Sequence, residues 1–551
     1  MTTATHYPQT TDLPVGRRPA KETLAGTGTM IRLVLRRNRI RLLVWWAVIV
    51  GLYAYVLVYY RDIFTTQSAL DDFAAISNVP SIKALTGLAA APATMGGAVW
   101  TKIWMTCALM LAFGVAFLVT RNGRADEEVG RTELLRSRVL GLHAYSVACW
   151  LVTAVLCFAV GISISVVSIA GSLDPAGAGI TGSLIVGASV IGVGLVAIGV
   201  AAVAGQVTST SRAANGLGAA VLGAFYVLRM IGDLGDGRLT WASPIGWGQE
   251  MQPWGANRWW PLGLTLVLTA LLLAVAYRLE ARRDLGAGLI AERSGRASAP
   301  HRYATPLGLA LRLERGPIIG WTLTIVLSAL MFGSVIDAMT PLMADANATV
   351  TSIMRGTGVA ALLSLLITMI AMITTVFAIQ TSLTLRGDET TGLIEPQLAG
   401  AVSRTRWALQ RLMIPAVGSA LLLLIGGALM GLGYGSSSGD NGQAVTLALA
   451  GLAYWPAVMV FVGIAVALFG WLPRLAVAVS WGVLAAMWIV VIVGDALHLP
   501  NWLTDLLPFS ATPYQPLDPM SWTPILILGA VAALLIWLGL FRFRRRDIET
   551  G

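Results

Sequence analysis

The chain has 551 residues, of which 56% are hydrophobic and 12% are charged, and its formal net charge is +10. A soluble domain carries about 25% charged residues, so this composition excludes a soluble globular protein and indicates a polytopic membrane protein. The positive charge is better explained by arginine gathered in cytoplasmic loops than by nucleic acid, which we do not expect as a partner.

Cysteine and histidine offer no sign of a disulfide framework or a metal site. Cys107, Cys149 and Cys157 all lie inside apolar segments, where they are expected to act as small core residues. The four histidines lie far apart in the sequence. We therefore expect no metal ion in this chain.

The N-terminal residues 1–29 are polar and lack the apolar segment of a signal peptide. We expect a flexible cytoplasmic tail there. The following stretch, Met30–Arg41, mixes arginine with Ile, Leu and Val, as does Leu309–Arg315 later in the chain. Both compositions are typical of helices in the cytoplasmic interface, with arginines facing lipid phosphates.

Twelve segments are long and apolar enough to cross a bilayer, which takes about 20 residues each. The fold class predicted is therefore all-α, with twelve spans in two six-helix halves. The spans of the first half are expected at 42–60, 100–120, 145–171, 181–205, 215–233 and 261–280. Those of the second half are expected at 318–338, 358–381, 407–433, 444–470, 474–494 and 523–541.

The arginines predict the topology. They gather before the first span, after the second, in the central linker and in the C-terminal tail, which all lie on one side if the spans alternate. That side is expected to be the cytoplasm of a multi-pass plasma (inner) membrane protein. Both termini would then be cytoplasmic, which an even number of spans requires.

The opposite side carries different segments. Residues 61–97 are expected to form short surface helices. Two stretches rich in Trp and Pro, 241–260 and 502–522, precede the last span of each half. Two interpretations stay open for them: an aromatic belt at the headgroup level, or an embedded hairpin that caps an outer exit. Their candidate residues are Trp241, Trp247, Trp254, Phe509 and Tyr514.

A charged decapeptide occurs twice, as RADEEVGRTE at 124–133 and RGDETTGLIE at 386–395. The offset is 386 − 124 = 262, and each copy lies between two predicted spans. Five pairs are identical at this offset: Arg124/Arg386, Asp126/Asp388, Glu127/Glu389, Gly130/Gly392 and Glu133/Glu395. Glu128 adds a further acid to the first copy.

The same register extends beyond the charged loops. Arg212 and Arg474, in the loops after the fourth and tenth spans, also differ by 262, and Arg283 and Arg546 differ by 263. We predict two parallel halves, 30–285 and 309–551, with charged loops 121–143 and 382–406 and a cytoplasmic linker 286–308. Such repeats imply a pseudo-two-fold axis along the membrane normal.

The chain shows no energy source of its own. Its three lysines, Lys21, Lys83 and Lys102, are never preceded by Gly, so the GxxxxGK[ST] nucleotide-binding loop is absent. Ionisable residues inside the spans are few: Arg229 is expected to reach outward or to pair locally. Coupling to an ion gradient therefore has little support.

Two interpretations of the charged loops were compared. A solvated loop with weak local ion pairs does not explain the second copy at the same offset. Acidic residues at the start of a short helix suit its dipole and could contact arginines of a partner. A docking role is favoured, and it would be carried by the two acidic clusters with Arg124 and Arg386.

These residues resemble the permease subunit of a type-2 ABC exporter, in which an acidic E-x-x-G-x-x-E stretch forms a coupling helix. Glu127, Gly130 and Glu133 match it, as do Glu389, Gly392 and Glu395. The fused, arginine-rich form is similar to actinobacterial polyketide-antibiotic (tetronasin-type) and mycobacterial multidrug efflux permeases. The resemblance implies two copies of a separate ATPase, which would bind ATP and magnesium. Pro396 departs from the first copy and is expected to shorten the second coupling helix.

The resemblance implies ATP-driven export of hydrophobic or amphiphilic compounds, with a substrate path between the halves. Candidate residues on that path are Phe113, Phe117, Phe225, Tyr226, Met487 and Trp488, although helix packing explains each of them as well. Three alternatives stay open: an exporter of lipids or envelope glycoconjugates, an ion-coupled secondary carrier, and a membrane enzyme. The last lacks clustered His, Asp or Cys.

Overall fold

The computed structural model describes residues 23–78, 80–136, 140–175, 177, 179–284, 286–290, 298, 300–303, 305–343, 358–400, 402–440, 442–493 and 507–548. The chain divides into two compact units, Met1–Ser294 and Gly295–Gly551. The boundary falls within the predicted linker 286–308. Throughout the described ranges the chain forms helices and turns and no strand, as the all-α prediction requires.

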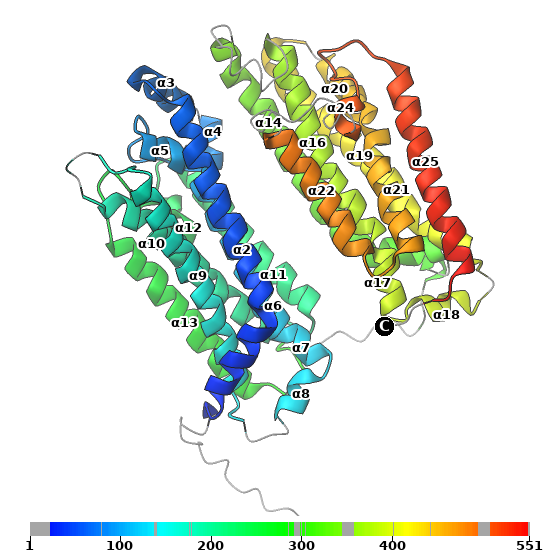
Figure 1. The fold of residues 1–551 in the computed structure, drawn as a ribbon, viewed down its shortest axis with the longest axis horizontal. Coiled ribbons are helices and arrows are strands. Elements are labelled where there is room, and N and C mark those ends of the chain that lie inside the picture. Colours follow the sequence, from blue (N-terminus) through cyan, green and yellow to red (C-terminus); the bar gives the residue numbers. More distant parts are fainter. Residues whose placement is uncertain are drawn as a thin grey trace, which may run out of the picture. The chain divides into compact units, whose positions relative to one another are not determined.

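The first unit is a bundle of long helices with short helices at both ends (Figure 1). Its helices are α2 (Thr27–Ile63), α3 (Gln67–Ser77), α4 (Pro80–Thr86), α5 (Met95–Val99), the π-helix η1 (Trp100–Trp104), α6 (Met105–Asn122), α7 (Arg124–Glu128), α8 (Arg131–Arg136), α9 (Ala144–Ala170), α10 (Thr181–Val207), α11 (Ser211–Leu234), the 3-10 helix η2 (Leu239–Ala242), α12 (Pro244–Gln249) and α13 (Trp260–Arg282).

The second unit repeats this order. After the 3-10 turn η3 (His301–Tyr303), its helices are α14 (Pro306–Met343), α16 (Gly358–Ser382), α17 (Thr384–Thr390), α18 (Ile394–Leu398), α19 (Arg404–Ser438), α20 (Gln443–Ala453), α21 (Trp455–Trp471), α22 (Ala476–Val493), α24 (Pro508–Ala511) and α25 (Trp522–Arg545). The short pair α7–α8 lies at one end of the first bundle, and α17–α18 lies at one end of the second (Figure 1).

The two units also share their packing partners. In the first, α9 packs on α2 and α10, and α10 packs on α6 and α13. In the second, α19 packs on α14 and α20, and α21 packs on α16 and α25. The repeat read from the sequence is therefore a repeat of helix packing.

Small residues let the neighbouring helices approach the buried helix α10 of the first bundle and the buried helix α21 of the second. A Cβ added at Gly187 of α10 would lie 2.1 Å from the carbonyl oxygen of Gly161 on α9. One added at Gly470 of α21 would lie 2.3 Å from that of Gly539 on α25. Any larger side chain would separate these pairs, as expected for helix contacts in a membrane.

Eleven of the described helices are long and apolar enough to span a membrane. They match the predicted spans, except the eleventh, where α22 contributes a shorter apolar stretch, Ala476–Trp488, and residues 494–506 lie outside the described ranges. The two arginine-rich stretches predicted to lie along the interface form the N-terminal turns of α2 and α14, continuous with the first span of each unit. The predicted short helices within 61–97 are confirmed as α3 and α4.

The predicted span 444–470 is divided. α20 ends at Ala453 and α21 begins at Trp455, with Pro456 in its first turn. Proline has no N–H to donate and is tolerated where no intrahelical bond is needed. Tyr454 at the junction is buried, and its hydroxyl lies 2.9 Å from the Oγ1 of Thr368 on α16.

Arg229 does not reach out of the bundle: it is fully buried on α11. Its Nη1 lies 3.0 Å from Oδ2 of Asp233, and its Nη2 donates to the carbonyl of Ala84 at 2.7 Å. Longer bonds run to the carbonyls of Lys83 and Leu85. The guanidinium therefore caps the C-terminal turn of α4, where unpaired carbonyls favour a cation.

We expect Arg229→Met to lower the free energy of unfolding by about 3–5 kcal/mol, because it leaves Asp233 buried without its counter-ion. Thermal unfolding of the detergent-solubilised protein measures this. Arg238→Met is the matched control, since Arg238 pairs with Asp236 on the surface, where its side chain is 89% exposed. This variant should unfold at the wild-type temperature. Equal midpoints for both variants would contradict the anchoring role.

Candidate functional site

The repeated acidic stretches form the two short helix pairs, and the same glycine conformation connects each pair. Gly130, between α7 and α8, has φ +70°, and Gly392, between α17 and α18, has φ +71°. This left-handed region strains residues that carry a Cβ. The glycine in the E-x-x-G-x-x-E pattern is therefore needed to reverse the chain.

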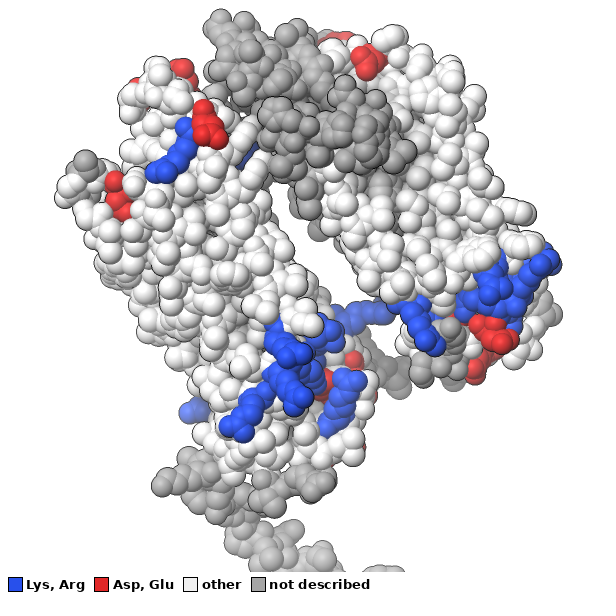
Figure 2. Space-filling model, viewed as in Figure 1, with Lys and Arg blue, Asp and Glu red and all other residues white. Residues whose placement is uncertain are grey.

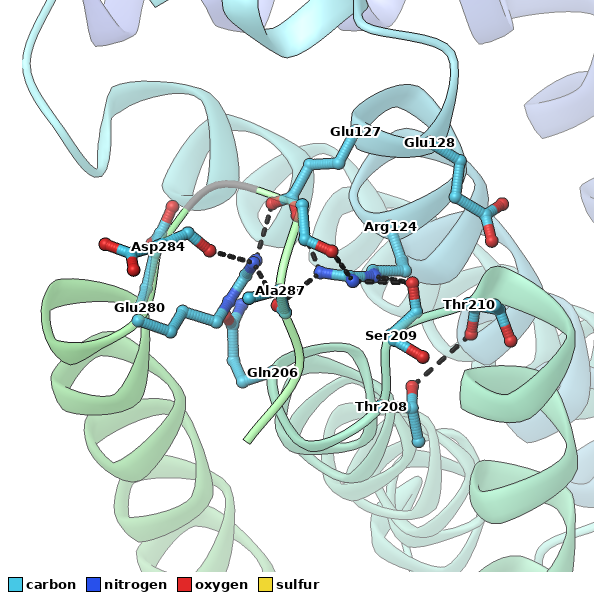
Figure 3. Close-up of polar contacts among 12 residues, drawn as sticks. Arg124, Glu127, Glu128, Gln206, Thr208, Ser209, Thr210, Glu280, Asp284 and Ala287 are labelled. Atoms are coloured by element: carbon cyan, nitrogen blue, oxygen red, sulfur yellow. Dashed lines mark hydrogen bonds and ion pairs between the residues drawn. The ribbon is translucent and has the colours of Figure 1, made fainter. Parts of the chain in front are cut away.

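The glutamate that precedes this turn is fixed by two arginines in the first unit (Figure 3). Arg124 Nη1 lies 2.9 Å from Glu127 Oε2, and Arg283 Nη2 lies 2.6 Å from Glu127 Oε1. The three side chains are between 1% and 8% exposed. Arg283 follows α13, so this ion-pair triad ties α7 to the end of the last helix.

Arg124 also connects α7 to two other segments (Figure 3). Its guanidinium donates to the carbonyl of Ser209, in the turn between α10 and α11, at 2.5–2.8 Å. It donates further to the carbonyls of Gly286 at 2.6 Å and Ala287 at 2.9 Å. Arg283 also bonds the side chain of Gln206. The buried Arg124 thus connects three segments that are distant in sequence: α7, the turn at Ser209 and the stretch Gly286–Ala287.

The second unit contains the same triad. Arg386 Nη1 lies 2.9 Å from Glu389 Oε2. Arg546, which follows α25, approaches both carboxylate oxygens of Glu389, at 2.5 and 2.8 Å. Glu389 is fully buried, and the Arg546 guanidinium also lies over the ring of Phe469 at 4.9 Å. Two-point contacts of this kind are the strongest that arginine makes with a carboxylate.

These triads change the role expected for the two glutamates. Sequence reasoning predicts that they face a partner, whereas their carboxylates are directed inward and are occupied by arginines of the same unit. A buried carboxylate is stable only when it is paired. Glu127 and Glu389 therefore anchor the short helices within their own units, and their part in contact with a partner stays a prediction.

The neighbouring aspartates are also buried, but their partners differ between the units. Asp126 accepts from Arg37 of α2 at 2.6 Å, from the Tyr145 hydroxyl at 2.6 Å and from Arg131 at 3.1 Å. Asp388 instead pairs with Arg411 of α19. The first helix pair is thus tied to α2 and α9, and the second is tied to α19.

A small surface remains exposed once the anchors are in place. In the first unit it comprises Val129, 63% exposed, Leu134, 75% exposed, and Glu133. In the second it comprises Leu393, 49% exposed, and Glu395. We name these residues the exposed turns. Each combines an apolar side chain with one exposed carboxylate.

Glu128 and the arginines of the second loops complete the predicted set. The Glu128 carboxylate accepts from the amide and the hydroxyl of Ser211 at the start of α11, at 2.7 and 2.5 Å. Arg212 and Arg474, in the loops after α10 and α21, are exposed. The loop after α10 thus meets α7 through Ser209 and Ser211 rather than through Arg212.

Pro396 lies in the first turn of α18, which spans Ile394–Leu398. The first turn of a helix has no N–H that needs an intrahelical partner, so proline does not interrupt the helix. α18 continues past Pro396 to Leu398, and the expectation that the second coupling helix is the shorter one stays a prediction, because residues 137–139 after α8 lie outside the described ranges.

The residues proposed for a substrate path pack within their own units. The rings of Phe113 and Phe117 lie 6.2 Å apart on α6, with Phe117 44% exposed. Phe225 and Tyr226 are partly buried, and the Tyr226 hydroxyl donates to the Leu85 carbonyl at 3.1 Å. In the second unit, Met487 and Trp488 pack on its hydrophobic core. Their role in transport stays a prediction.

The Trp- and Pro-rich stretches fold back onto their own bundles. Trp241 stacks on Trp260 at 4.9 Å and accepts a hydrogen bond from Trp247 at 2.7 Å. Trp254 is buried against α5 and α10, where added Cβ atoms at Gly96 and Gly182 would strike its ring.

In the second unit, Phe509 is buried beside Tyr454 and Phe461. The Tyr514 carbonyl accepts from Ser364 of α16 at 3.0 Å. These aromatic side chains serve the packing of each unit, and a role in capping an exit stays a prediction. The first part of the second stretch, residues 502–506, lies outside the described ranges.

Some site residues were not found by reading motifs. Arg283 and Arg546 were visible as a pair at offset 263, and the structure shows that both bind the repeated glutamate. No repeat offset links Arg37 and Arg411. They bind the equivalent aspartates Asp126 and Asp388, but Arg37 lies on the first span of its unit and Arg411 on the third.

Two repeated bundles of membrane-length helices, each with an anchored pair of short helices at one end, define a polytopic α-helical permease. A family described as "Multidrug efflux system permease Rv1217c, C-terminal domain" matches residues 303–544. The multidrug efflux system permease protein Rv1217c of Mycobacterium tuberculosis (strain ATCC 25618 / H37Rv) is 37% identical over 545 residues. This alignment covers 97% of the chain and 98% of that protein. The chain belongs to the multidrug efflux system permease family, which confirms the resemblance predicted from the coupling loops.

We expect Glu389→Gln to loosen α17 and α18, because it leaves Arg386 and Arg546 without a buried counter-charge, at a cost of about 3–5 kcal/mol. Hydrogen–deuterium exchange should rise across residues 384–398. Glu395→Gln, on the exposed turn of the same element, is the matched control and should leave exchange unchanged. If both variants exchange like the wild type, Glu389 is not an anchor.

Proposed function

We propose that the chain is the membrane-embedded subunit of an ATP-driven exporter that moves hydrophobic or amphiphilic compounds out of the cell. The observation that supports it most is the pair of equivalent short helices, each fixed to the end of its bundle by a buried Arg–Glu–Arg triad. An anchored helix transmits force to the bundle, whereas a solvated loop would yield. The name of the mycobacterial relative supports drugs as the cargo.

The energy source belongs to a second protein. Because the chain has no GK dipeptide, ATP and magnesium would bind to a separate ABC ATPase, one copy for each helix pair. The exposed turns would dock on the ATPase, and the triads would pass its movement to α13 and α25. Closure of the ATPase dimer would then alternate the access of the cargo site between the two sides of the membrane.

This function fixes the orientation of the chain. The helix pairs and the chain termini would lie in the cytoplasm of a plasma (inner) membrane protein, as the arginine distribution also favours. The membrane lipids would surround the exposed apolar faces of the spans. An exporter of lipids or envelope glycoconjugates shares this architecture and differs only in cargo.

Docking through the exposed turns predicts that Glu133→Arg with Glu395→Arg abolishes co-purification of the ATPase, because a cation replaces each exposed carboxylate. The control is Asp71→Arg with Asp72→Arg, which makes the same charge change on α3, at the other end of the first unit. Co-purification is measured after detergent extraction. Retention of the ATPase by the first variant would refute docking at these turns.

Energy coupling is tested separately by efflux from intact cells. An ATP-driven exporter should continue to clear a fluorescent amphiphile after a proton uncoupler, provided that ATP is maintained. An ion-coupled carrier would stop under the uncoupler and continue when ATP is depleted.

The proposed substrate path predicts that Tyr226 affects which compounds are exported. Tyr226→Ala should narrow the range of compounds to which cells are resistant, and Tyr226→Phe distinguishes the reason. The Phe variant keeps the ring but loses the hydroxyl bond to Leu85. Wild-type resistance in the Phe variant with loss in the Ala variant indicates contact with cargo. Equal loss in both indicates that Tyr226 serves only to hold α4.

A further inference from the structure

A second group of arginines lies beside the anchored helices of the first unit. Arg37 and Arg41 lie on α2, Arg121 lies at the end of α6 and Arg131 begins α8. We name them the arginine cluster. Figure 2 shows blue side chains gathered on the end of the first unit where Figure 1 places α7 and α8.

The cluster carries more positive charge than its own acids balance. Asp126 pairs with Arg37 at 2.6 Å and with Arg131 at 3.1 Å. Arg41 and Arg121 have no ion-paired or hydrogen-bonded partner in the described part of the chain. Arg37 donates to the side chain of Asn122, which follows Arg121 on α6, at 2.7 Å, so Arg121 lies beside the arginines of α2. Like charges held this close repel, so an anion bound between them would be stabilised.

The surroundings of the cluster indicate which anion fits. The same turns of α2 expose Ile40, 68% exposed, Leu43, 63% exposed, and Val44, 54% exposed. Exposed apolar side chains interleaved with arginine are typical of the lipid–water interface. A phospholipid satisfies both features, because its phosphate meets the guanidinium groups while its acyl chains cover the apolar residues. An acidic protein surface would leave the apolar residues uncovered.

The arginine cluster occurs in the first half and is not repeated at the equivalent positions of the second half. Adding 276 to Arg37 and Arg41, the offset between Arg36 and Arg312, gives Leu313 and Pro317. Adding 262 to Arg121 and Arg131 gives Leu383 and Leu393. All four arginines are thus replaced in the second half, where Asp388 is paired by Arg411 instead.

We propose that the first unit binds the phosphate group of an anionic phospholipid between Arg41 and Arg121, with Arg37 and Arg131 at its sides. Because Arg37 and Arg131 also hold Asp126 of α7, the bound headgroup lies next to the first anchored helix pair. In the second half, none of the four equivalent positions holds an arginine. The proposed headgroup site is therefore a feature of the first helix pair.

Native mass spectrometry of the detergent-purified protein, titrated with phosphatidylglycerol or phosphatidylcholine, tests this site without the ATPase. The wild type should bind phosphatidylglycerol preferentially. Arg41→Gln with Arg121→Gln should weaken that binding about 25-fold at low ionic strength, or about fivefold for each arginine. Arg36→Gln with Arg39→Gln removes the same charge from exposed positions of α2 and should bind as the wild type does.

Four outcomes would overturn the proposal. They are equal binding of the two lipids, wild-type affinity in the Arg41/Arg121 variant, an equal loss in the Arg36/Arg39 variant, and complete displacement of the lipid by millimolar inorganic phosphate. Loss of ATPase co-purification in the Arg41/Arg121 variant with lipid binding unchanged would assign the cluster to an acidic protein surface. The lipid measurement does not depend on ATPase docking, so either proposal can fail alone.

Discussion

The structure at the α7–α8 and α17–α18 ends depends on a carboxylate buried between two arginines. Helices of five to seven residues are not stable alone in water, so their positions must be fixed by contacts outside themselves. Glu127 and Glu389 supply that contact, because a buried carboxylate must be paired and the second arginine of each pair follows the last helix of its unit. The triad thus converts a charged turn into a rigid extension of α13 or α25.

The two halves share this constraint and differ in what surrounds it. The triads superpose residue for residue at offsets of 262 and 263, but Asp126 is held from α2 and Asp388 from α19. Asp126 is also held by Tyr145 of α9, so both helix pairs connect to the third span of their unit, and Arg37 adds a connection to the first span in the first unit. The helix pairs are alike in shape and unlike in their mechanical connections.

Sequence reasoning recovered the helical class, the positions of the spans and the repeat, since each depends on local composition or on the spacing of identical residues. It placed Glu127 and Glu389 on the surface, because their partners Arg283 and Arg546 lie about 157 residues further along the chain and polar segments are expected to be solvated. It also treated residues 30–41 as a separate helix, because their arginines suggested an interfacial position. Nothing in the sequence at Leu42–Trp45 showed that one helix runs on into the first span. The break before Pro456 was missed because apolar content alone does not show where a helix is interrupted.

Burial of four of the repeated acids limits how a partner can recognise this protein. Asp126, Glu127, Asp388 and Glu389 are occupied within their own units. Glu128 is exposed but bound to Ser211, which leaves Glu133 beside Val129 and Leu134, and Glu395 beside Leu393, as the exposed carboxylates without such a bond. Exposed ion pairs contribute little, whereas burial of an apolar side chain contributes about 1.5–3 kcal/mol. A partner would therefore gain most of its affinity from an apolar groove that receives the turn. The remaining carboxylate, Glu133 or Glu395, would orient the turn in that groove.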